Sequence, residues 1–86
     1  MNLTEQVLHV LDGALHLQGR ATSFTRETPL LGALPELDSM AVLALLTGLE
    51  NHFGVTFSDD EIHGSVFATV GGLSDLVGQA RARQAT

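Results

Sequence analysis

Apolar residues recur at every third or fourth position at the start of the chain and predict an amphipathic helix from about Leu3 to about Leu17. The residues of its inward face are Leu3, Val7, Val10, Leu11, Ala14 and Leu17. Asn2, with Glu5 three residues later, has the form of a capping box that starts the helix. Residues 18–20, Gln-Gly-Arg, are expected to end it.

No sustained period follows until Glu36, so a long loop rich in Ser, Thr, Gly and Pro is expected there. Its apolar residues are expected to anchor it to the core: Phe24, Leu30, Leu31, Leu34 and Leu37. A second helix follows, capped by the Asp38 carboxylate and ended by Gly54. Its inward stripe is Val42, Leu45, Leu46, Leu49 and Phe53. Its first turns are also apolar outside this stripe, at Met40, Ala41, Leu43 and Ala44, so we expect a second use for them.

The last third of the chain predicts a short helix and a longer one. Ser58 and the acids after it precede Ile62 and suit a short third helix, which Gly64 and Ser65 are expected to end. Thr69 is expected to cap the last helix, whose inward face is Val70, Leu73, Leu76, Val77 and Ala80. Three glycines in it, Gly71, Gly72 and Gly78, each cost about 1 kcal/mol relative to alanine, so tertiary packing must hold the helix. We interpret Gly71 and Gly72 as close-packing positions.

These elements predict an all-α fold, a four-helix bundle of three main helices and one short helix with a long first loop. With 86 residues, the chain is expected to form one domain spanning residues 1–86. There is no cysteine, so disulfides and thiolate metal sites are excluded, and any thiol chemistry needs a sulfur from outside the chain.

The charges are distributed unevenly along the chain, whose net charge is -6. No Lys or Arg lies between Arg26 and Arg81, so we expect an acidic middle that repels nucleic acid and attracts basic protein partners. A solvated surface that only keeps the protein soluble is the alternative interpretation. The first residues carry no basic segment of a signal peptide, and no apolar run is long enough to span a membrane, so we expect a cytoplasmic protein.

One stretch, LLGALPELDSM at residues 30–40, resembles the attachment motif of the acyl carrier protein family, in which an Asp-Ser pair precedes a large aliphatic residue. Three other segments fit the family at the expected separations: TPL at 28–30, FGV at 53–55 and FATVGGLSDLV at 67–77. An Asp-Ser-Met triplet alone is most often a plain helix cap, so the resemblance depends on the whole series.

The resemblance implies that a phosphopantetheinyl transferase, using coenzyme A and Mg²⁺, joins a covalent 4'-phosphopantetheine arm to Ser39. Acyl groups would ride on the thiol of that arm as thioesters. It implies a carrier with no catalytic residues, which is not an enzyme, and we expect a monomer. Its other partners would be an acyl-loading ligase, an acyltransferase or a synthase with a basic docking surface.

Because the family docks through its second and third helices, the resemblance also implies a set of partner-docking residues: Asp38, Met40, Leu43, Thr47, Asp59, Asp60, Glu61 and Ile62. A position at the edge of the core is an equally good interpretation of Met40. Two other functions stay open, an unmodified carrier-like interaction module and a peptidyl or aminoacyl carrier.

The second helix departs from carriers of fatty-acid synthesis, since Ala41, Ala44 and Asn51 stand where acids are frequent there. We therefore expect a specialised set of partners. The sequence LPELDSMAV, followed later in the chain by FATVGGL, looks most like that of small carriers associated with bacterial exosortase and exopolysaccharide loci. Leu46, Ile62 and Phe67 are the candidates for lining a channel that would hold an acyl chain.

Two other kinds of site are discounted. No two of the four histidines have metal-ligand spacing on one helix, so we expect no metal site: His9, His16, His52 and His63. A Ser-His-Asp site built from Ser39, His52 and Asp38 would lack the G-x-S-x-G elbow and the chain needed to enclose a substrate.

Overall fold

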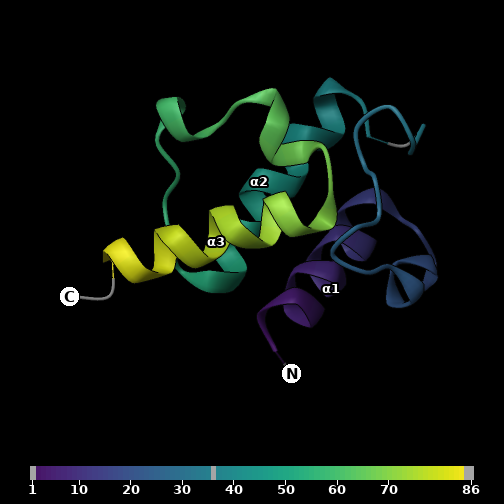
Figure 1. Ribbon diagram of the computed structural model, residues 1–86, viewed down its shortest axis with the longest axis horizontal. Coiled ribbons are helices and arrows are strands. Elements are labelled where there is room, and N and C mark those ends of the chain that lie inside the picture. Colours follow the sequence, from purple (N-terminus) through teal and green to yellow (C-terminus); the bar gives the residue numbers. More distant parts are fainter. Residues whose placement is uncertain (1, 36, 85–86) are drawn as a thin grey trace.

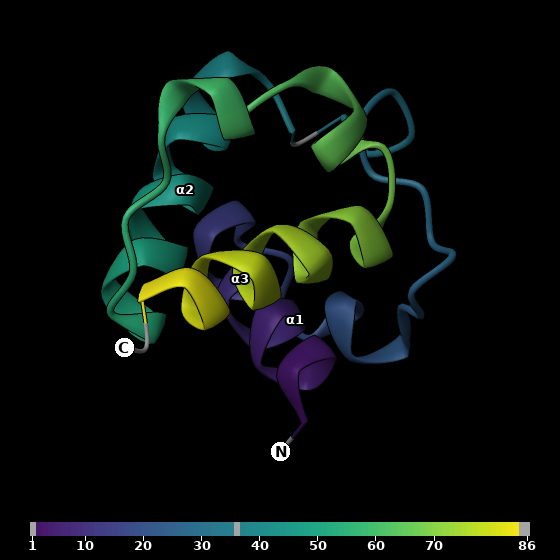
Figure 2. The ribbon, with the colours of Figure 1, turned by 60° about the vertical axis from the view of Figure 1, so that its left-hand side comes forward.

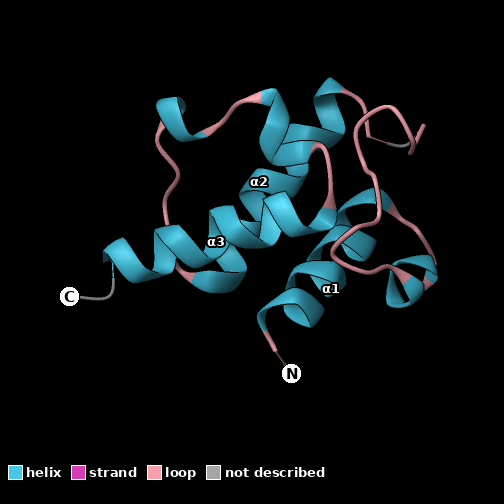
Figure 3. Cartoon of the chain, viewed as in Figure 1, coloured by secondary structure: helices cyan, strands magenta, loops and turns pink. Residues whose placement is uncertain are grey.

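The computed structural model describes residues 2–35 and 37–84, with the side chain of Asp59 left out, and it is all-α (Figures 1 and 3). Three main helices are joined by loops and three short 3-10 turns, labelled η. In chain order the elements are α1 (Leu3–Leu15), η1 (Arg20–Ser23), α2 (Ser39–Phe53), η2 (Asp59–Glu61), η3 (Gly64–Phe67) and α3 (Val70–Gln84). The fold class predicted from the sequence is confirmed.

Each main helix begins at the cap that the sequence predicts. For α1, Asn2 Oδ1 accepts a hydrogen bond from the Glu5 N–H at 2.8 Å. For α2, Asp38 Oδ1 accepts one from the Ala41 N–H at 2.8 Å. For α3, Thr69 Oγ1 accepts one from the Gly72 N–H at 3.2 Å. α2 ends where expected, because Gly54 adopts the left-handed backbone (φ 66°) that favours glycine.

α1 ends at Leu15, earlier than the sequence predicts. His16 takes a left-handed backbone conformation with φ 56°, which stops the helix. The carboxylate of Asp12 then accepts a hydrogen bond from the Gly19 N–H at 2.9 Å and holds the turn. Leu17 is nevertheless only 1% exposed, so it reaches the core from this turn and not from the helix.

The long first loop is anchored by four of the five apolar residues named from the sequence. Leu30 and Leu37 are buried, while Phe24 and Leu34 pack half-buried against the core. Leu31 was expected to be an anchor, and this prediction is wrong, because half of its surface is exposed.

Backbone hydrogen bonds strap this loop to the start of α3. From the loop, the N–H groups of Leu30 and Leu31 donate to the carbonyls of Ala68 and Phe67, both at 2.9 Å. In the other direction, the N–H groups of Val70 and Gly71 donate to the carbonyls of Thr28 and Arg26, at 3.0 and 2.8 Å. Residues 26–31 of this loop are therefore fixed to the junction between η3 and α3.

The short third helix is replaced by the two turns η2 and η3. His63 lies between them in an extended conformation (φ -142°, ψ 166°), so the helix does not continue. Gly64, expected to end a helix, instead begins η3. This arrangement brings Val66 and Phe67 into the core, and their burial explains why the chain breaks at His63.

The core lies where the three main helices meet, with α1 contacting both α2 and α3 (Figure 2). The predicted inward face of α3 is confirmed, because all five residues are buried: Val70, Leu73, Leu76, Val77 and Ala80. The predicted stripe of α2 is buried at Leu45, Leu46 and Leu49, but Val42 and Phe53 are only partly buried at its ends.

Two glycines of α3 stand where another chain segment comes close, as the sequence predicts. A Cβ on Gly72 would lie 2.9 Å from the carbonyl oxygen of Val66, and one on Gly71 would lie 3.0 Å from that of Arg26. Among the helices of the described residues, none is long and apolar enough to cross a membrane.

Candidate attachment site

Ser39 is the first residue of α2 and its side chain is exposed. The residue before it, Asp38, is extended and caps the helix, and the Asp38 carbonyl also accepts from the Val42 N–H at 2.9 Å. The Ser39 hydroxyl has no hydrogen-bond partner within residues 2–35 and 37–84. It therefore stands at a well-fixed helix start, open to an incoming group.

The backbone at this position suits a phosphate. Asp38 occupies the Ala41 N–H, whereas the N–H groups of Ser39 and Met40 find no acceptor in the described part of the chain. Such first-turn N–H groups, at the positive end of the helix dipole, favour an anionic oxygen. The first turn of α2 contains no acidic residue, although the Asp38 carboxylate at the cap beside it would repel an anionic oxygen.

The candidate docking residues of α2 lie on one flank of the helix. Met40, Leu43 and Thr47 follow one another at helical spacing, and all three are exposed. Met40 is 73% exposed, so it does not sit at the edge of the core, and Leu43 is 61% exposed. The structure thus brings Ser39 and this flank together at one end of α2.

The docking residues expected from the third helix have different environments. Asp60 is exposed, and the side chain of Asp59 lies outside the described residues. Ile62 is half-buried and packs against the core. The carboxylate of Glu61 is paired with a residue of α3, because Arg83 Nη2 donates to its Oε1 at 2.8 Å and Arg83 Nη1 donates to its Oε2. The hydrogen bonds from Arg83 are the largest cause that lowers the pKa of Glu61 to about 2.

The acidic middle of the sequence is partly neutralised in space. Arg26 folds back onto Asp75 with an Nη2 to Oδ1 distance of 3.1 Å, and Arg83 pairs with Glu61. Glu50 is half-buried, and its Oε2 accepts from the Phe57 N–H at 2.9 Å. Sequence patterns could not show these pairs, since 49 and 22 residues separate the two arginines from their acids.

The discounted sites find no geometric support. Ser39 and His52 lie at opposite ends of α2, about 20 Å apart at 1.5 Å per residue. His52 packs edge-on against the ring of Phe53, and a ring nitrogen of His63 hydrogen-bonds with the Ser65 hydroxyl at 2.6 Å. Within the described residues, no three His, Asp or Glu side chains converge on a metal position.

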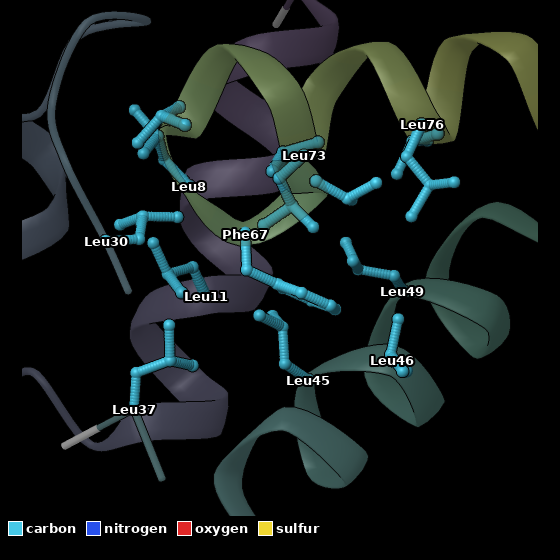
Figure 4. Close-up of a cluster of buried hydrophobic side chains, with 14 of the residues drawn as sticks. Leu8, Leu11, Leu30, Leu37, Leu45, Leu46, Leu49, Phe67, Leu73 and Leu76 are labelled. Carbon is cyan, nitrogen blue, oxygen red and sulfur yellow. The ribbon is translucent and has the colours of Figure 1, made fainter. Parts of the chain in front are cut away.

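The three candidates for lining an acyl channel are part of the core or pack against it, with Ile62 half-buried. Leu46 and Phe67 are buried, and Figure 4 shows the ring of Phe67 pointing toward Leu45 and Leu49 of α2, below Leu73 of α3. One hollow on the described surface lies elsewhere, between α1 and η1, where Leu8, Asp12 and Thr22 line it.

The whole arrangement matches a solved structure over nearly its full length. A solution NMR structure of a holo acyl carrier protein from Nitrosomonas europaea superposes with a TM-score of 0.89 at 39% sequence identity, covering 95% of this chain and 99% of that one. This chain belongs to the acyl carrier protein family. Membership in this family indicates that the chain acts as a carrier protein.

A second family member supports the same assignment. The holo acyl carrier protein from Geobacter metallireducens matches with a TM-score of 0.77 and 25% identity over 99% of this chain and 92% of its own. No model of a protein family matches the chain, and neither does any curated protein.

Proposed function

We propose that this family member carries acyl groups as thioesters on a 4'-phosphopantetheine arm joined to Ser39 Oγ. The observation that carries the proposal is the exposed Ser39 at the capped start of α2, whose hydroxyl has no partner among the described residues, in a chain similar to proteins described as holo carriers. A transferase using coenzyme A and Mg²⁺ would form the Ser39 Oγ–P bond, with loss of the serine proton and of the nucleotide half of coenzyme A.

The residues around Ser39 would hold the base of the arm. The hydrogen bond from the Ala41 N–H to Asp38 Oδ1 fixes the first turn of α2, and with it the backbone of Ser39. The N–H groups of Ser39 and Met40 would face the new phosphodiester at the positive end of the helix. When bound, the arm supplies the thiol that this cysteine-free chain lacks, and tethering raises the effective concentration of the acyl group at a docked partner.

The same proposal names the partners by class. They are a phosphopantetheinyl transferase and an acyl ligase, acyltransferase or synthase that loads or accepts the acyl group, acting on a cytoplasmic, monomeric carrier that is not itself an enzyme. The scarcity of acids in α2 supports a specialised pathway, of the kind that the resemblance to exosortase-associated carriers implies. A basic docking surface on a partner would now depend on the acids of η2, mainly Asp60, since Glu61 is paired with Arg83.

Mass spectrometry tests the attachment. Incubation with coenzyme A, Mg²⁺ and a broad-specificity transferase should add one phosphopantetheinyl group to the parent protein and none to Ser39→Ala. Ser23→Ala is the matched control, because Ser23 is an exposed serine of η1, and it should gain the group like the parent. If the parent gains no mass, the protein is an unmodified interaction module. If the holo protein accepts only amino acids from loading enzymes, it is a peptidyl carrier.

A further inference from the structure

A hollow with a volume of about 420 Å³ lies between α1 and η1. Residues of both elements line it: Glu5, Leu8, His9, Asp12, Gly19 and Thr22. Its four residues from α1 follow one another at helical spacing, so they share one face of the helix. In Figures 1 and 2 the first turns of α1 and η1 lie at the bottom of the molecule, whereas α2 begins at the top. The hollow is therefore well separated from the proposed attachment site at Ser39.

The wall that η1 contributes to the hollow is held in place by the carboxylate of Asp12. The Oδ2 atom of Asp12 accepts from the N–H groups of Gly19 at 2.9 Å and Ala21 at 3.1 Å, and Ala21 is fully buried. Thr22 Oγ1 also donates to the Gly19 carbonyl at 2.7 Å. Because the wall is formed before any ligand arrives, binding there would cost little ordering of the protein.

The chemistry of the hollow combines negative charge with an apolar base. Glu5 is exposed, and it stands two helical turns from Asp12, about 10 Å along the axis. Among the described residues, neither carboxylate forms an ion pair. A carboxylate has about four acceptor positions, so Asp12 keeps its charge and part of its acceptor capacity while it holds the turn. Leu8, which is 7% exposed, supplies an apolar surface between the two acids.

We propose that this hollow is a docking site for an arginine side chain of a partner protein. A guanidinium is less strongly hydrated than an ammonium and spreads its donors over a planar fork, so it suits separated acceptors around an apolar base. The net charge of -6 would steer a basic partner toward the chain. A partner held here would leave the start of α2 uncovered, so that a second protein could reach Ser39 at the same time. The proposal goes beyond the carrier function and does not depend on modification of Ser39.

NMR titration of the isotope-labelled, unmodified protein tests this docking. The probe is arginine with an acetylated amine and an amidated carboxyl group, and the same derivative of citrulline is its uncharged isostere. The arginine probe should shift the amide signals of residues around the hollow, such as His9 and Thr22, with a Kd of about 1 to 10 mM. The citrulline probe should bind at least about fivefold more weakly, because its hydrogen bonds are not assisted by charge.

Two variants locate the binding. Glu5→Gln removes one charge at the rim and keeps the backbone N–H that donates to Asn2, so the helix start is preserved. This change should weaken binding of the arginine probe about three- to fivefold, the effect of losing one exposed ion pair. Asp60→Asn is the matched control, because it removes an equal charge from an exposed position in η2, and it should bind the probe like the parent.

The proposal would be overturned by equal affinity for the two probes, or by equal affinity of the parent and Glu5→Gln for the arginine probe. Shifts spread over all exposed acids would indicate unspecific attraction and would also overturn it. The same holds if the hollow shows no shift at probe concentrations about tenfold above the expected Kd. None of these outcomes affects the attachment of the arm to Ser39, which mass spectrometry tests separately.

Discussion

Replacing Gly72 with alanine should destabilise the protein, although alanine is the better helix former. In a helix interior, alanine is favoured over glycine by about 1 kcal/mol. At Gly72, however, the new Cβ would stand 2.9 Å from the Val66 carbonyl oxygen and 3.2 Å from that of Ser65. Both neighbours are backbone atoms of η3, which cannot rotate away as a side chain can. Overpacking of this kind costs about 1 to 3 kcal/mol, so we expect a net loss of about 1 kcal/mol.

The same substitution at two other helical glycines supplies the controls. A Cβ on Gly13 of α1 meets nothing within 4 Å, so Gly13→Ala should stabilise the protein by up to about 1 kcal/mol. On Gly78 of α3 it would meet only Leu3 Cδ2 at 3.3 Å, the end of a flexible side chain, so Gly78→Ala should be close to neutral.

Urea unfolding followed by circular dichroism measures the three variants on one scale, provided that the m-value stays constant. We expect Gly13→Ala to be more stable than the parent, Gly78→Ala to be close to the parent, and Gly72→Ala to be less stable than the parent. If Gly72→Ala is as stable as Gly13→Ala, the close contact between η3 and α3 does not exist as described.

Three further changes test other parts of the structure. Phe53→Ala should lower the unfolding free energy by about 1 to 2 kcal/mol and not the 3 to 5 kcal/mol of a buried ring, because Phe53 is half-buried beneath the Arg81 guanidinium; a loss of 3 kcal/mol or more in urea would contradict this. Asp38→Ala removes the cap of α2 and should lower the urea midpoint by an amount equivalent to about 1 kcal/mol, whereas an unchanged midpoint would mean that the cap is not formed in solution. The pKa of Glu61 should be about 2 by NMR titration and should rise toward 4.5 in Arg83→Gln. Because this pKa is depressed, the stabilisation is fully present above about pH 4.5 and is lost as the pH falls toward 2; equal values in parent and variant would exclude the pair.

The elements that local patterns determine could be predicted from the sequence. Periodic apolar residues and caps such as Asp38 and Thr69 act within a few residues of the helix they start, so spacing alone reveals them. The place of Ser39 at a helix start was predicted in the same way, because it follows from the adjacent cap.

Features that depend on distant segments could not be predicted. Leu31 has the same character in the sequence as Leu30, but the backbone bonds to Phe67 and Ala68 turn Leu30 inward and leave Leu31 exposed. Glu61 looked like a docking acid because Arg83 is far away in the sequence. The break of the third helix at His63 follows from the burial of side chains beyond it, which a local helix signal does not report.

The strap between the first loop and the start of α3 bears on how this carrier could move. Peeling the loop away would break its hydrogen bonds to residues 67–71 and expose Leu30, which is fully buried, so the loop should open only when the whole protein unfolds. The amides of Leu30 and Leu31, which donate to Ala68 and Phe67, should then exchange with solvent as slowly as those of the helices, although the loop lacks regular structure. Residues 26–31 would behave as a rigid part of the fold, so the reach of the carrier would have to come from the arm proposed at Ser39.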